Sequence, residues 1–547
     1  MRKLFLALAL LSTAVLASAE TLQLQKGDNI AIVGSGLADR QQHYGNFEAL
    51  IHQAFPNHEL VVRNLGFSGD EITIHHRSDE VPTLEYFLNM KPGLLNTKAG
   101  NTPITYHAGA DFHANVIFAY WGFNESFHGP EGLNEFKGNL DAWLKKQLAS
   151  DNGKGHPRVV LFSPIATEDM KSRNFDPAVA VRNNKNLALY TAAMAEVAKA
   201  NNVQFVDLFK ASQELFAKAS QRLTINGIHL NEAGDQALAP VQFKAVFGKD
   251  AGSVNNKVLE AVNEKSTQWH HRYRTVDQYN IYGGRSRIKY EGVDNATVLG
   301  EELADRDIKT ANRDKAIWAA AQGNNSYVVK DDNLQPVQTP PPNRKQPVPY
   351  LNGPDALKFL KSPDGTKIEF VADETTVPEL INPVQMNFDT KGRLWIACWP
   401  NYPETSPTTK VFDKIIVLDL EPGTGKVLKH TTFLDGLNCP TGFQFYKDGI
   451  ILIQSPDIWF VRDTNGSGHA NWKEKILTGM DAADSHHETN SICYEPGGAM
   501  YFSDGVFHRT QVETFNGAIR NTNGGIYRFE PQTSKFERYV PYGFANP

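Results

Sequence analysis

Cysteine is scarce in this sequence of 547 residues, where it occurs only as Cys398, Cys439 and Cys493. None of the three belongs to a C-x-x-C or C-x-x-C-H motif, so the sequence gives no support to a zinc knuckle or to covalently attached haem. All three lie in the C-terminal part of the chain. One disulfide with one free thiol, and three buried thiols, are equally compatible with this spacing.

Clusters of basic residues and long apolar stretches are also missing from most of the chain. The formal net charge is -6, and no run of Lys and Arg marks a surface for nucleic acid or lipid. After residue 19, no apolar stretch reaches the length needed to span a membrane. We therefore expect no nucleic-acid partner and no membrane span, whereas the oligomeric state is left open.

One short apolar run stands at the N-terminus. Arg2 and Lys3 precede the apolar residues 4–16, and the small residues 17–19 (Ala-Ser-Ala) follow them. This order is typical of a secretory signal peptide over residues 1–19, with cleavage after Ala19. We expect the mature protein to be exported, to the periplasm or the extracellular space.

Short apolar runs alternate with helical patterns between residues 20 and 250. The predicted strands are residues 29–33, 59–64, 115–120, 158–163 and 203–207. The predicted helices are residues 41–55, 133–148 and 183–201. This alternation predicts a three-layer α/β domain with a parallel sheet. In such sheets ligands bind beyond the carboxyl ends of the strands, which here run into segments rich in Gly, Ser and Asn.

A histidine stands just before a predicted helix near the end of this domain. His229 follows the turn-forming pair Asn226-Gly227, and Asn231 is expected to cap the helix that follows. A histidine at the mouth of a loop has the access to substrate that a general base requires. On these residues alone, a surface turn with an incidental histidine explains the pattern as well.

The remainder of the chain divides into three parts. Residues 251–330 are polar and helical in pattern and predict a helical extension of the first domain. Within them, residues 269–274 (Trp-His-His-Arg-Tyr-Arg) form an aromatic and basic segment that either packs on the first domain or lines its cleft. Residues 331–352 are rich in proline, which predicts a stiff, extended linker and the main domain boundary.

Residues 353–547 are predicted to form short strands joined by turns, and they contain an internal repeat. An aromatic residue precedes a glycine by four positions in three places, Phe388/Gly392, Phe445/Gly449 and Tyr494/Gly498. The interval of about fifty residues is in the range of β-propeller blades. About three blades fit before the end, and a ring needs at least four. We therefore expect a partial, all-β propeller. An apparently truncated chain is the favoured explanation, and closure of the ring with another chain is the alternative.

Four segments of the first domain, taken together, resemble the SGNH (GDSL-type) hydrolase superfamily. They are residues 34–37 (Gly-Ser-Gly-Leu), 66–70 (Gly-Phe-Ser-Gly-Asp), 122–125 (Gly-Phe-Asn-Glu) and 226–229 (Asn-Gly-Ile-His). The resemblance covers about residues 27–245 and implies an ester-hydrolysing site without a cofactor. It implies that His229 is the base and that the Gly69 N–H and the Asn124 amide stabilise the oxyanion. The implied substrate is an acylated small molecule or carbohydrate.

Two positions depart from that family's pattern. Gly36 stands at the position of the nucleophile, and Asn226 at that of the acid. Ser35 can serve as nucleophile if the glycine-flanked turn shifts by one residue, with Ser68 as an alternative and Asp70 as a substitute acid. Asn226 can hold an imidazole by a hydrogen bond but cannot stabilise imidazolium by charge, a loss of ~10⁴-fold in rate in a Ser triad.

Three hypotheses follow. The first is an ester hydrolase with Ser35, His229 and Asn226 as catalytic residues. The second is a catalytically inactive protein that binds a glycan or a partner. The third draws on the wider resemblance to secreted, modular bacterial proteins that join an SGNH-like domain to a dehydrogenase-like (PVC-type, haem-module-associated) propeller. Under it, the chain is a fragment of an oxidoreductase. The residues that carry this resemblance are 395–397, 435–443, 486–491 and 543–547.

Two smaller signals concern metals. Oxygen-bearing side chains occupy EF-hand-like positions in one loop, at Asp463, Asn465, Ser467, Asn471 and Glu474. Only two of them are anionic, so we expect weak calcium binding, and a hairpin turn explains the same residues. Residues 486–488 (His-His-Glu) are expected to pack at a strand end, because adjacent side chains on a strand point to opposite faces.

Overall fold

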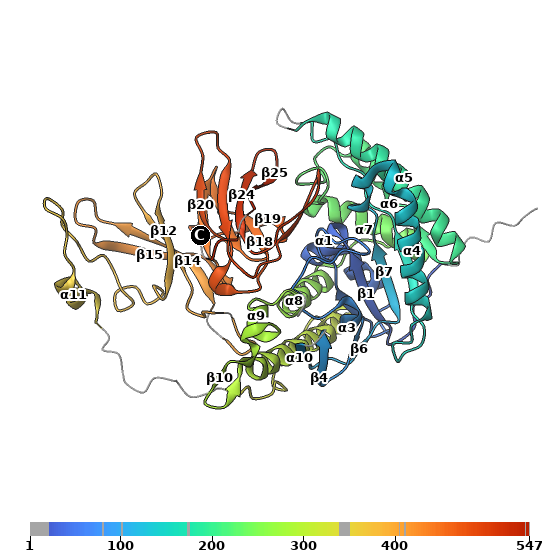
Figure 1. Cartoon of the computed structure of the whole chain (residues 1–547), viewed down its shortest axis with the longest axis horizontal. Helices are drawn as coiled ribbons and strands as arrows, with labels where there is room; N and C mark the ends of the chain where they lie inside the picture. The colour runs from blue at the N-terminus through green and yellow to red at the C-terminus, as the bar shows by residue number, and fades with distance from the viewer. Residues whose placement is uncertain are drawn as a thin grey trace, which may run out of the picture.

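The computed structural model describes residues 21–78, 81–99, 102–171, 175–338, 351–403, 405–409, 412–541 and 543–545. The predicted signal peptide and most of the predicted linker lie outside these ranges. Within them, no helix is both long enough and apolar enough to cross a membrane. Figure 1 shows a helix-rich N-terminal part beside a C-terminal part made of strands, with α8 and α9 lying next to the strands.

A five-stranded parallel sheet forms the centre of the N-terminal part, in the order β2-β1-β7-β8-β9. Its strands are β1 (Asn29–Gly34), β2 (Val61–Asn64), β7 (Val116–Tyr120), β8 (Arg158–Phe162) and β9 (Gln204–Val206). Every residue of β1 and β7 is buried, as expected where helices cover both faces of a parallel sheet. The prediction of an α/β domain with a parallel sheet is confirmed.

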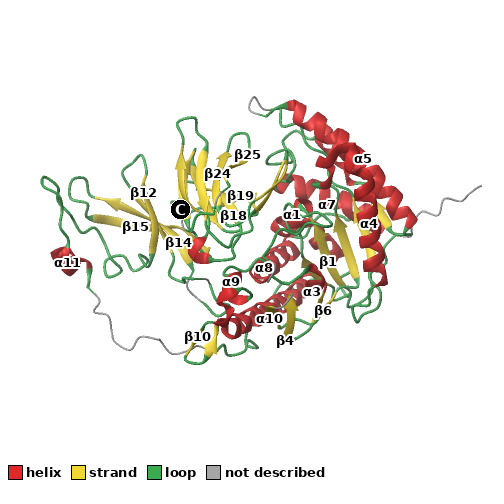
Figure 2. Ribbon diagram, in the orientation of Figure 1, coloured by secondary structure: helices red, strands yellow, loops and turns green. Residues whose placement is uncertain are grey.

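Alternate residues of β1 face two different cores, because side chains along a strand point to opposite faces. Ala31 and Val33 pack in the core formed with α4 (Leu133–Ala149) and α5 (Pro177–Ala200). Ile30 and Ile32 pack in the core formed with α2 (Asn46–Ala54) and α7 (Glu232–Phe247). Figure 2 shows α4, α5 and α7 beside β1 of this sheet.

The single helix predicted over residues 41–55 is wrong. The chain forms α1 (Gly36–Tyr44) and α2 instead, separated by Gly45 in the left-handed conformation at φ 70°. A side chain at Gly45 would be strained there and would also come within 2.6 Å of the Asn263 Oδ1 atom. The predicted cap of α7 is confirmed, since the Asn231 side chain accepts a hydrogen bond from the Gly234 N–H.

Two long helices, α8 (Asn256–Tyr273) and α10 (Asn295–Ala321), pack against each other at the β2 edge of the sheet. The indole of Trp269 donates to the carbonyl of Asn64 at the end of β2, over 2.6 Å. The buried Arg272 guanidinium pairs with Asp307 of α10 at 3.0 Å. The aromatic and basic segment therefore does pack on the first domain.

The C-terminal part contains three four-stranded antiparallel sheets. The first comprises β12 (Pro383–Phe388), β13 (Leu394–Cys398), β14 (Asp413–Leu420) and β15 (Val427–Leu437). The second comprises β16 (Gly442–Tyr446), β17 (Gly449–Gln454), β18 (Asp457–Arg462) and β19 (Trp472–Thr478). The third comprises β20 (Asn490–Tyr494), β21 (Met500–Asp504), β24 (Gly525–Glu530) and β25 (Lys535–Val540). The sequence repeat marks the turn between the first two strands of each sheet. The propeller itself stays a prediction.

An extra hairpin, β22 (Gln511–Thr514) and β23 (Gly517–Arg520), is inserted between β21 and β24 of the third sheet. The three cysteines are free thiols, Cys398 and Cys439 buried and Cys493 exposed. Neither arrangement that the sequence left open, one disulfide or three buried thiols, is therefore found. The remaining short elements are α3 (Leu84–Leu88), β3 (Asn89–Met90), β4 (Gly93–Ala99), β5 (Thr102–Ala108), β6 (Phe112–His113), η1 (Glu125–Gly132), α6 (Leu208–Lys218), α9 (Gln278–Ile281), η2 (Gly284–Arg287), β10 (Lys289–Tyr290), β11 (Val293–Asp294), α11 (Gly353–Ala356), η3 (Leu357–Phe359) and η4 (Ser485–His487).

Candidate functional site

The four sequence segments meet at the carboxyl edge of the parallel sheet. Gly36 begins α1 directly after β1, Gly69 follows β2, and Asn124 follows β7. His229 ends the loop before α7, which is closed by a hydrogen bond from the Ile225 N–H to the His229 carbonyl at 2.9 Å. The Asn124 and His229 side chains are buried.

A carboxylate from the C-terminal part occupies the centre of this site. The Glu513 Oε2 atom, from β22, accepts hydrogen bonds from the Gly36 N–H at 3.1 Å, the Gly69 N–H at 3.1 Å and the Asn124 side-chain amide at 2.8 Å. The other oxygen, Oε1, lies 3.0 Å from the His229 Nε2 atom. Glu513 is only 3 % exposed. Both oxygens of this carboxylate are therefore partnered within the protein.

The Glu513 carboxylate occupies the space that a side chain at position 36 would need. A Cβ atom built on Gly36 would come within 2.1 Å of the Glu513 Oε1 and 2.9 Å of the His229 Nε2. Oε1 thus lies where a side chain at position 36 would lie. Oε2 lies among the hydrogen-bond donors of Gly36, Gly69 and Asn124.

The Glu513 side chain is bound in its ionised form. Burial alone would raise its pKa. The hydrogen bonds from His229, Asn124 and the Gly36 N–H together lower the pKa of Glu513 below its ordinary value. Carboxylates that accept several N–H bonds are stabilised in this way.

Asn226 sets the tautomer of His229. The Asn226 Oδ1 accepts hydrogen bonds from the backbone N–H groups of Ile228 and His229, so its Nδ2 faces the His229 Nδ1 at 3.0 Å. An amide nitrogen can only donate, so Nδ1 accepts and the proton of the neutral ring resides on Nε2. His229 therefore donates to Glu513 from Nε2 and cannot take up a proton there.

Ser35 lies beside the Glu513 carboxylate. It precedes α1 in an extended conformation, and its side chain makes no capping hydrogen bond. Ser35, Ile228 and Glu513 line the same small cavity. Among the hydrogen bonds of the described chain, none joins Ser35 to His229, whose Nε2 bonds to Glu513.

The other two candidate side chains lie in the loop after β2. The Ser68 hydroxyl is buried without a hydrogen-bond partner. Asp70 pairs with His75 at 2.9 Å and with Arg77 at 2.7 Å. Burial opposes ionisation of Asp70, but the charge of Arg77 and the hydrogen bond from His75 lower its pKa. Asp70 thus serves a local ion pair on this loop.

Glu125 joins the second and third segments. Its carboxyl group accepts the N–H groups of Ile72 at 3.0 Å and of Gly122 at 3.0 Å. Burial raises the pKa of Glu125 to about 7. The glutamate of the Gly-x-Asn-Glu segment therefore fixes the loop that carries Asn124.

The β22–β23 hairpin is held on the first domain at both ends. Near its base, Gln511 donates to the Ser68 carbonyl at 3.1 Å, and Arg520 donates to the Gly69 carbonyl at 2.7 Å. At its tip, the carbonyl of Phe515 accepts from the Asn183 amide at 2.9 Å, and its ring packs on Phe175 at 5.2 Å. These contacts fix the position of Glu513.

The predicted calcium loop forms the turn between β18 and β19. The Asp463 carboxylate accepts the N–H groups of Gly466 and Gly468, both at 2.8 Å. Glu474 lies in β19 and lines a cavity between the two parts of the chain. No group of three or more His, Cys, Asp or Glu side chains is arranged to hold a metal ion in the described part of the chain. Calcium binding stays an untested prediction.

His486 and His487 lie just before a strand rather than on one, which agrees with the expected position at a strand end. They form a single 3₁₀ turn, η4, just before β20, with their rings 5.0 Å apart in an edge-on arrangement.

Two family models match parts of this chain. Residues 27–237 match the GDSL-like Lipase/Acylhydrolase family, and residues 353–542 match a domain of unknown function, DUF7133. No curated protein matches. Residues 27–237 are therefore similar to the GDSL-like lipase/acylhydrolase family, and we call them the GDSL-like domain.

Solved structures similar to this chain include three enzymes. A gut microbial diltiazem-metabolizing enzyme is 20% identical, with a TM-score of 0.30 over 42% of this chain and 48% of that one. The chain thus spans about half the length of that enzyme. A catalytic mutant of Axe2, an acetylxylan esterase from Geobacillus stearothermophilus, is 15% identical, with a TM-score of 0.30 over 41% of this chain and 96% of that one. An alpha/beta hydrolase enzyme from the metagenome of Lake Arreo, Spain, is 16% identical, with a TM-score of 0.28 over 41% of this chain and 96% of that one.

Proposed function

We propose that the GDSL-like domain of this protein is a non-hydrolytic carboxylate receptor, and that the chain works as a two-domain binding protein. The observation that carries this proposal is the Glu513 carboxylate, which accepts hydrogen bonds from the Gly36 N–H, the Gly69 N–H, Asn124 and His229. Donors arranged for an oxyanion also form charge-assisted hydrogen bonds with a permanent carboxylate. The site therefore joins the two parts of the chain.

Two further features favour binding over ester hydrolysis. Acyl transfer needs a nucleophile and a base that can take its proton. Position 36 offers no side chain, and the tautomer set by Asn226 leaves His229 with its proton already on Nε2. The same change of tautomer accounts for the ~10⁴-fold loss of rate when the acid of a Ser triad becomes an amide.

Ester hydrolysis by Ser35 is the second candidate function. The observation that favours it is the cavity that Ser35 shares with Glu513 at the carboxyl edge of the sheet. In this alternative, the β22–β23 hairpin withdraws and Ser35 attacks a short acyl ester of a small molecule or carbohydrate, with Gly69 and Asn124 stabilising the oxyanion.

A hydrolysis assay decides between the two functions. Full-length protein is incubated with p-nitrophenyl acetate and with an acetylated xylo-oligosaccharide, and the variants Ser35→Ala, His229→Ala and Glu513→Ala are tested in parallel. We expect rates at the level of the uncatalysed reaction for all four proteins. Turnover by the wild type that both Ser35→Ala and His229→Ala abolish would establish the hydrolase instead.

The proposals on location and on the C-terminal part rest on sequence patterns. The N-terminal signal-peptide pattern supports export, and the fifty-residue repeat supports a propeller. Mass spectrometry of the protein expressed with its N-terminus intact is expected to show a chain that begins at Glu20. A redox role rests only on the wider family resemblance, and a cofactor absorbance band in the purified protein would support it.

A further inference from the structure

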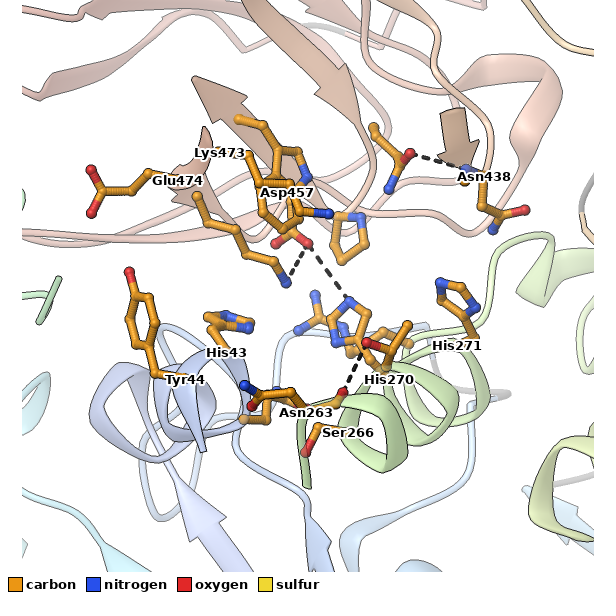
Figure 3. A pocket seen from close by; sticks show the side chains of 18 of the residues that line it. His43, Tyr44, Asn263, Ser266, His270, His271, Asn438, Asp457, Lys473 and Glu474 are labelled. Carbon is orange, nitrogen blue, oxygen red and sulfur yellow. Dashed lines mark hydrogen bonds and ion pairs between the residues drawn. The ribbon is translucent and has the colours of Figure 1, made fainter. Parts of the chain in front are cut away.

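A second polar site lies between the two parts of the chain, away from Glu513. It is a cavity of about 420 Å³ lined by helices α1 and α8 on one side and by strands β18 and β19 on the other. Figure 3 shows His43 and Tyr44 of α1 and His270 of α8 facing Asp457 and Lys473. Its volume falls in the range of small-molecule pockets, about 300–1,000 Å³.

Several buried polar atoms on the wall of this cavity have no hydrogen-bond partner. On the α8 side they include the Ser266 hydroxyl and the Asn263 Oδ1 atom. On the opposite side they include the Ser455 hydroxyl and the Asp457 Oδ1 atom. Ser266, Ser455 and Asp457 are each at most 4 % exposed. Buried polar atoms are almost always paired, so a wall with several unpaired ones from both domains indicates a site built for a polar ligand.

The unpaired atoms are a mixture of donors and acceptors. Ser266 and Ser455 offer hydroxyl groups, whereas Asn263 and Asp457 offer acceptor oxygens. Neither ring nitrogen of His270 has a hydrogen-bond partner, although Nε2 lies 3.7 Å from Asp457. Burial, followed by the charges of Lys475 and Arg274, lowers the pKa of His270 well below its ordinary value. The neutral ring therefore presents one donor and one acceptor.

Positively and negatively charged side chains on the wall of this cavity nearly balance. Lys475 pairs with Asp457 at 2.7 Å. The charged side chains that line the cavity are, on the cationic side, Arg274, Arg306, Lys473 and Lys475, and, on the anionic side, Glu232, Asp457 and Glu474. This near balance gives little net attraction for an ion. A hydroxyl group, which both donates and accepts, suits neighbouring donors and acceptors on one wall.

We propose that this cavity binds an uncharged polyhydroxylated ligand of the size of a mono- or disaccharide. The two walls belong to different parts of the chain, so the ligand bridges them. Its residues are separate from those around Glu513, and the proposal therefore holds whichever function that site has.

Isothermal titration of the full-length protein with sugars tests the proposal. The probes are xylose, glucose, cellobiose and maltose as uncharged sugars, and glucuronate as an anionic sugar. We expect at least one uncharged sugar to bind and to do so more tightly than glucuronate. Absence of heat with all five probes, or binding of glucuronate alone, would overturn the proposal.

Matched variants locate the binding site. Ser266→Ala combined with Asn263→Ala removes a donor and an acceptor from the α8 wall, and we expect about tenfold weaker binding of the sugar. Ser455→Ala alters the opposite wall, and we expect binding to weaken by about threefold. Ser253→Ala, on the exposed segment just before α8, is the control and is expected to leave affinity unchanged. Unchanged affinity in both cavity variants would place the sugar elsewhere and contradict the inference.

The thermal unfolding midpoint separates lost binding from lost folding. Removing a hydroxyl group that has no partner takes away no hydrogen bond of the fold, so we expect the sugar-free midpoints of Ser266→Ala and Ser455→Ala to match the wild type. A sugar that binds the native protein raises the wild-type midpoint, and this rise is expected to shrink in the cavity variants and to persist in Ser253→Ala.

Discussion

Two polar sites lie between the same two parts of this chain, and they differ in whether a protein side chain fills their centre. Around Glu513, both carboxylate oxygens accept hydrogen bonds from the GDSL-like domain. In the cavity between α8 and β18, polar atoms such as the Ser266 hydroxyl and the Asp457 Oδ1 lack partners. A buried group gains little when paired and costs more when left unpaired. The first site therefore fixes the two domains, whereas the second is prepared to receive a ligand.

The largest effect on stability is expected when Glu513 is removed. Glu513→Ala leaves the donors of Gly36, Gly69, Asn124 and His229 without their acceptor. We expect a loss of about 3–5 kcal/mol in the free energy of unfolding, because several buried donors lose their acceptor and each unpaired donor costs about 1–3 kcal/mol. Urea denaturation measures it. Glu537→Ala, which removes a half-buried carboxylate on β25, is the control and is expected to cost no more than about 1 kcal/mol. Equal losses in the two variants would contradict the role given to Glu513.

Restoring a side chain at position 36 tests the same contact from the other side. The Cβ of Gly36→Ser would come within 2.1 Å of the Glu513 Oε1, so we expect a loss of about 1–3 kcal/mol. In the Glu513→Ala background the same substitution is expected to cost much less. A double-mutant cycle by urea denaturation measures this coupling, and additive effects would show that the serine and the carboxylate do not compete for one place.

Acidification is expected to weaken the docking of Glu513. The pKa of this group is lower in the folded protein than its ordinary value. Its contribution is therefore complete above the ordinary glutamate pKa of about 4.3 and is lost as the pH falls through the folded pKa. Unfolding free energies of the wild type and Glu513→Gln, measured between pH 7 and pH 3, should differ most at pH 7 and converge toward pH 3. A constant difference would mean that Glu513 does not titrate.

The smallest effect is expected in the cavity. Ser266→Ala removes a hydroxyl group without a partner and should change the free energy of unfolding by less than about 0.5 kcal/mol. Ser163 is the matched comparison, because its buried hydroxyl accepts the N–H groups of Leu208 at 2.8 Å and Phe209 at 3.0 Å. Ser163→Ala leaves both donors unpaired and should cost about 1–3 kcal/mol. Similar losses in the two variants would show that Ser266 is paired in solution.

The parts of the site that local sequence determines were predictable. The apolar runs that became β1 and β7 are short and buried, and the residues that follow them supply Gly36 and Asn124 at the sheet edge. The Asn-Gly turn and the Asn231 cap likewise position His229. Glu513 was not predictable, because it is 284 residues away from His229 and lies in a hairpin whose docking depends on the packing of two domains. The orientation of the Asn226 side-chain amide was also not predictable from the sequence. It depends on which backbone N–H groups donate to the amide oxygen.

Glu513 and its hydrogen-bond donors belong to the same chain. An external molecule must therefore bind these donors tightly enough to displace a tethered carboxylate. A tethered group reaches its site at an effective concentration, which is on the order of millimolar even for a flexible linker. The hairpin that carries Glu513 is held at its base and at its tip, so its effective concentration is higher than that of a free tether. Free acetate or an acyl ester that binds the same donors weakly would remain excluded at ordinary concentrations. Only a molecule that also displaces the Phe515 tip could compete.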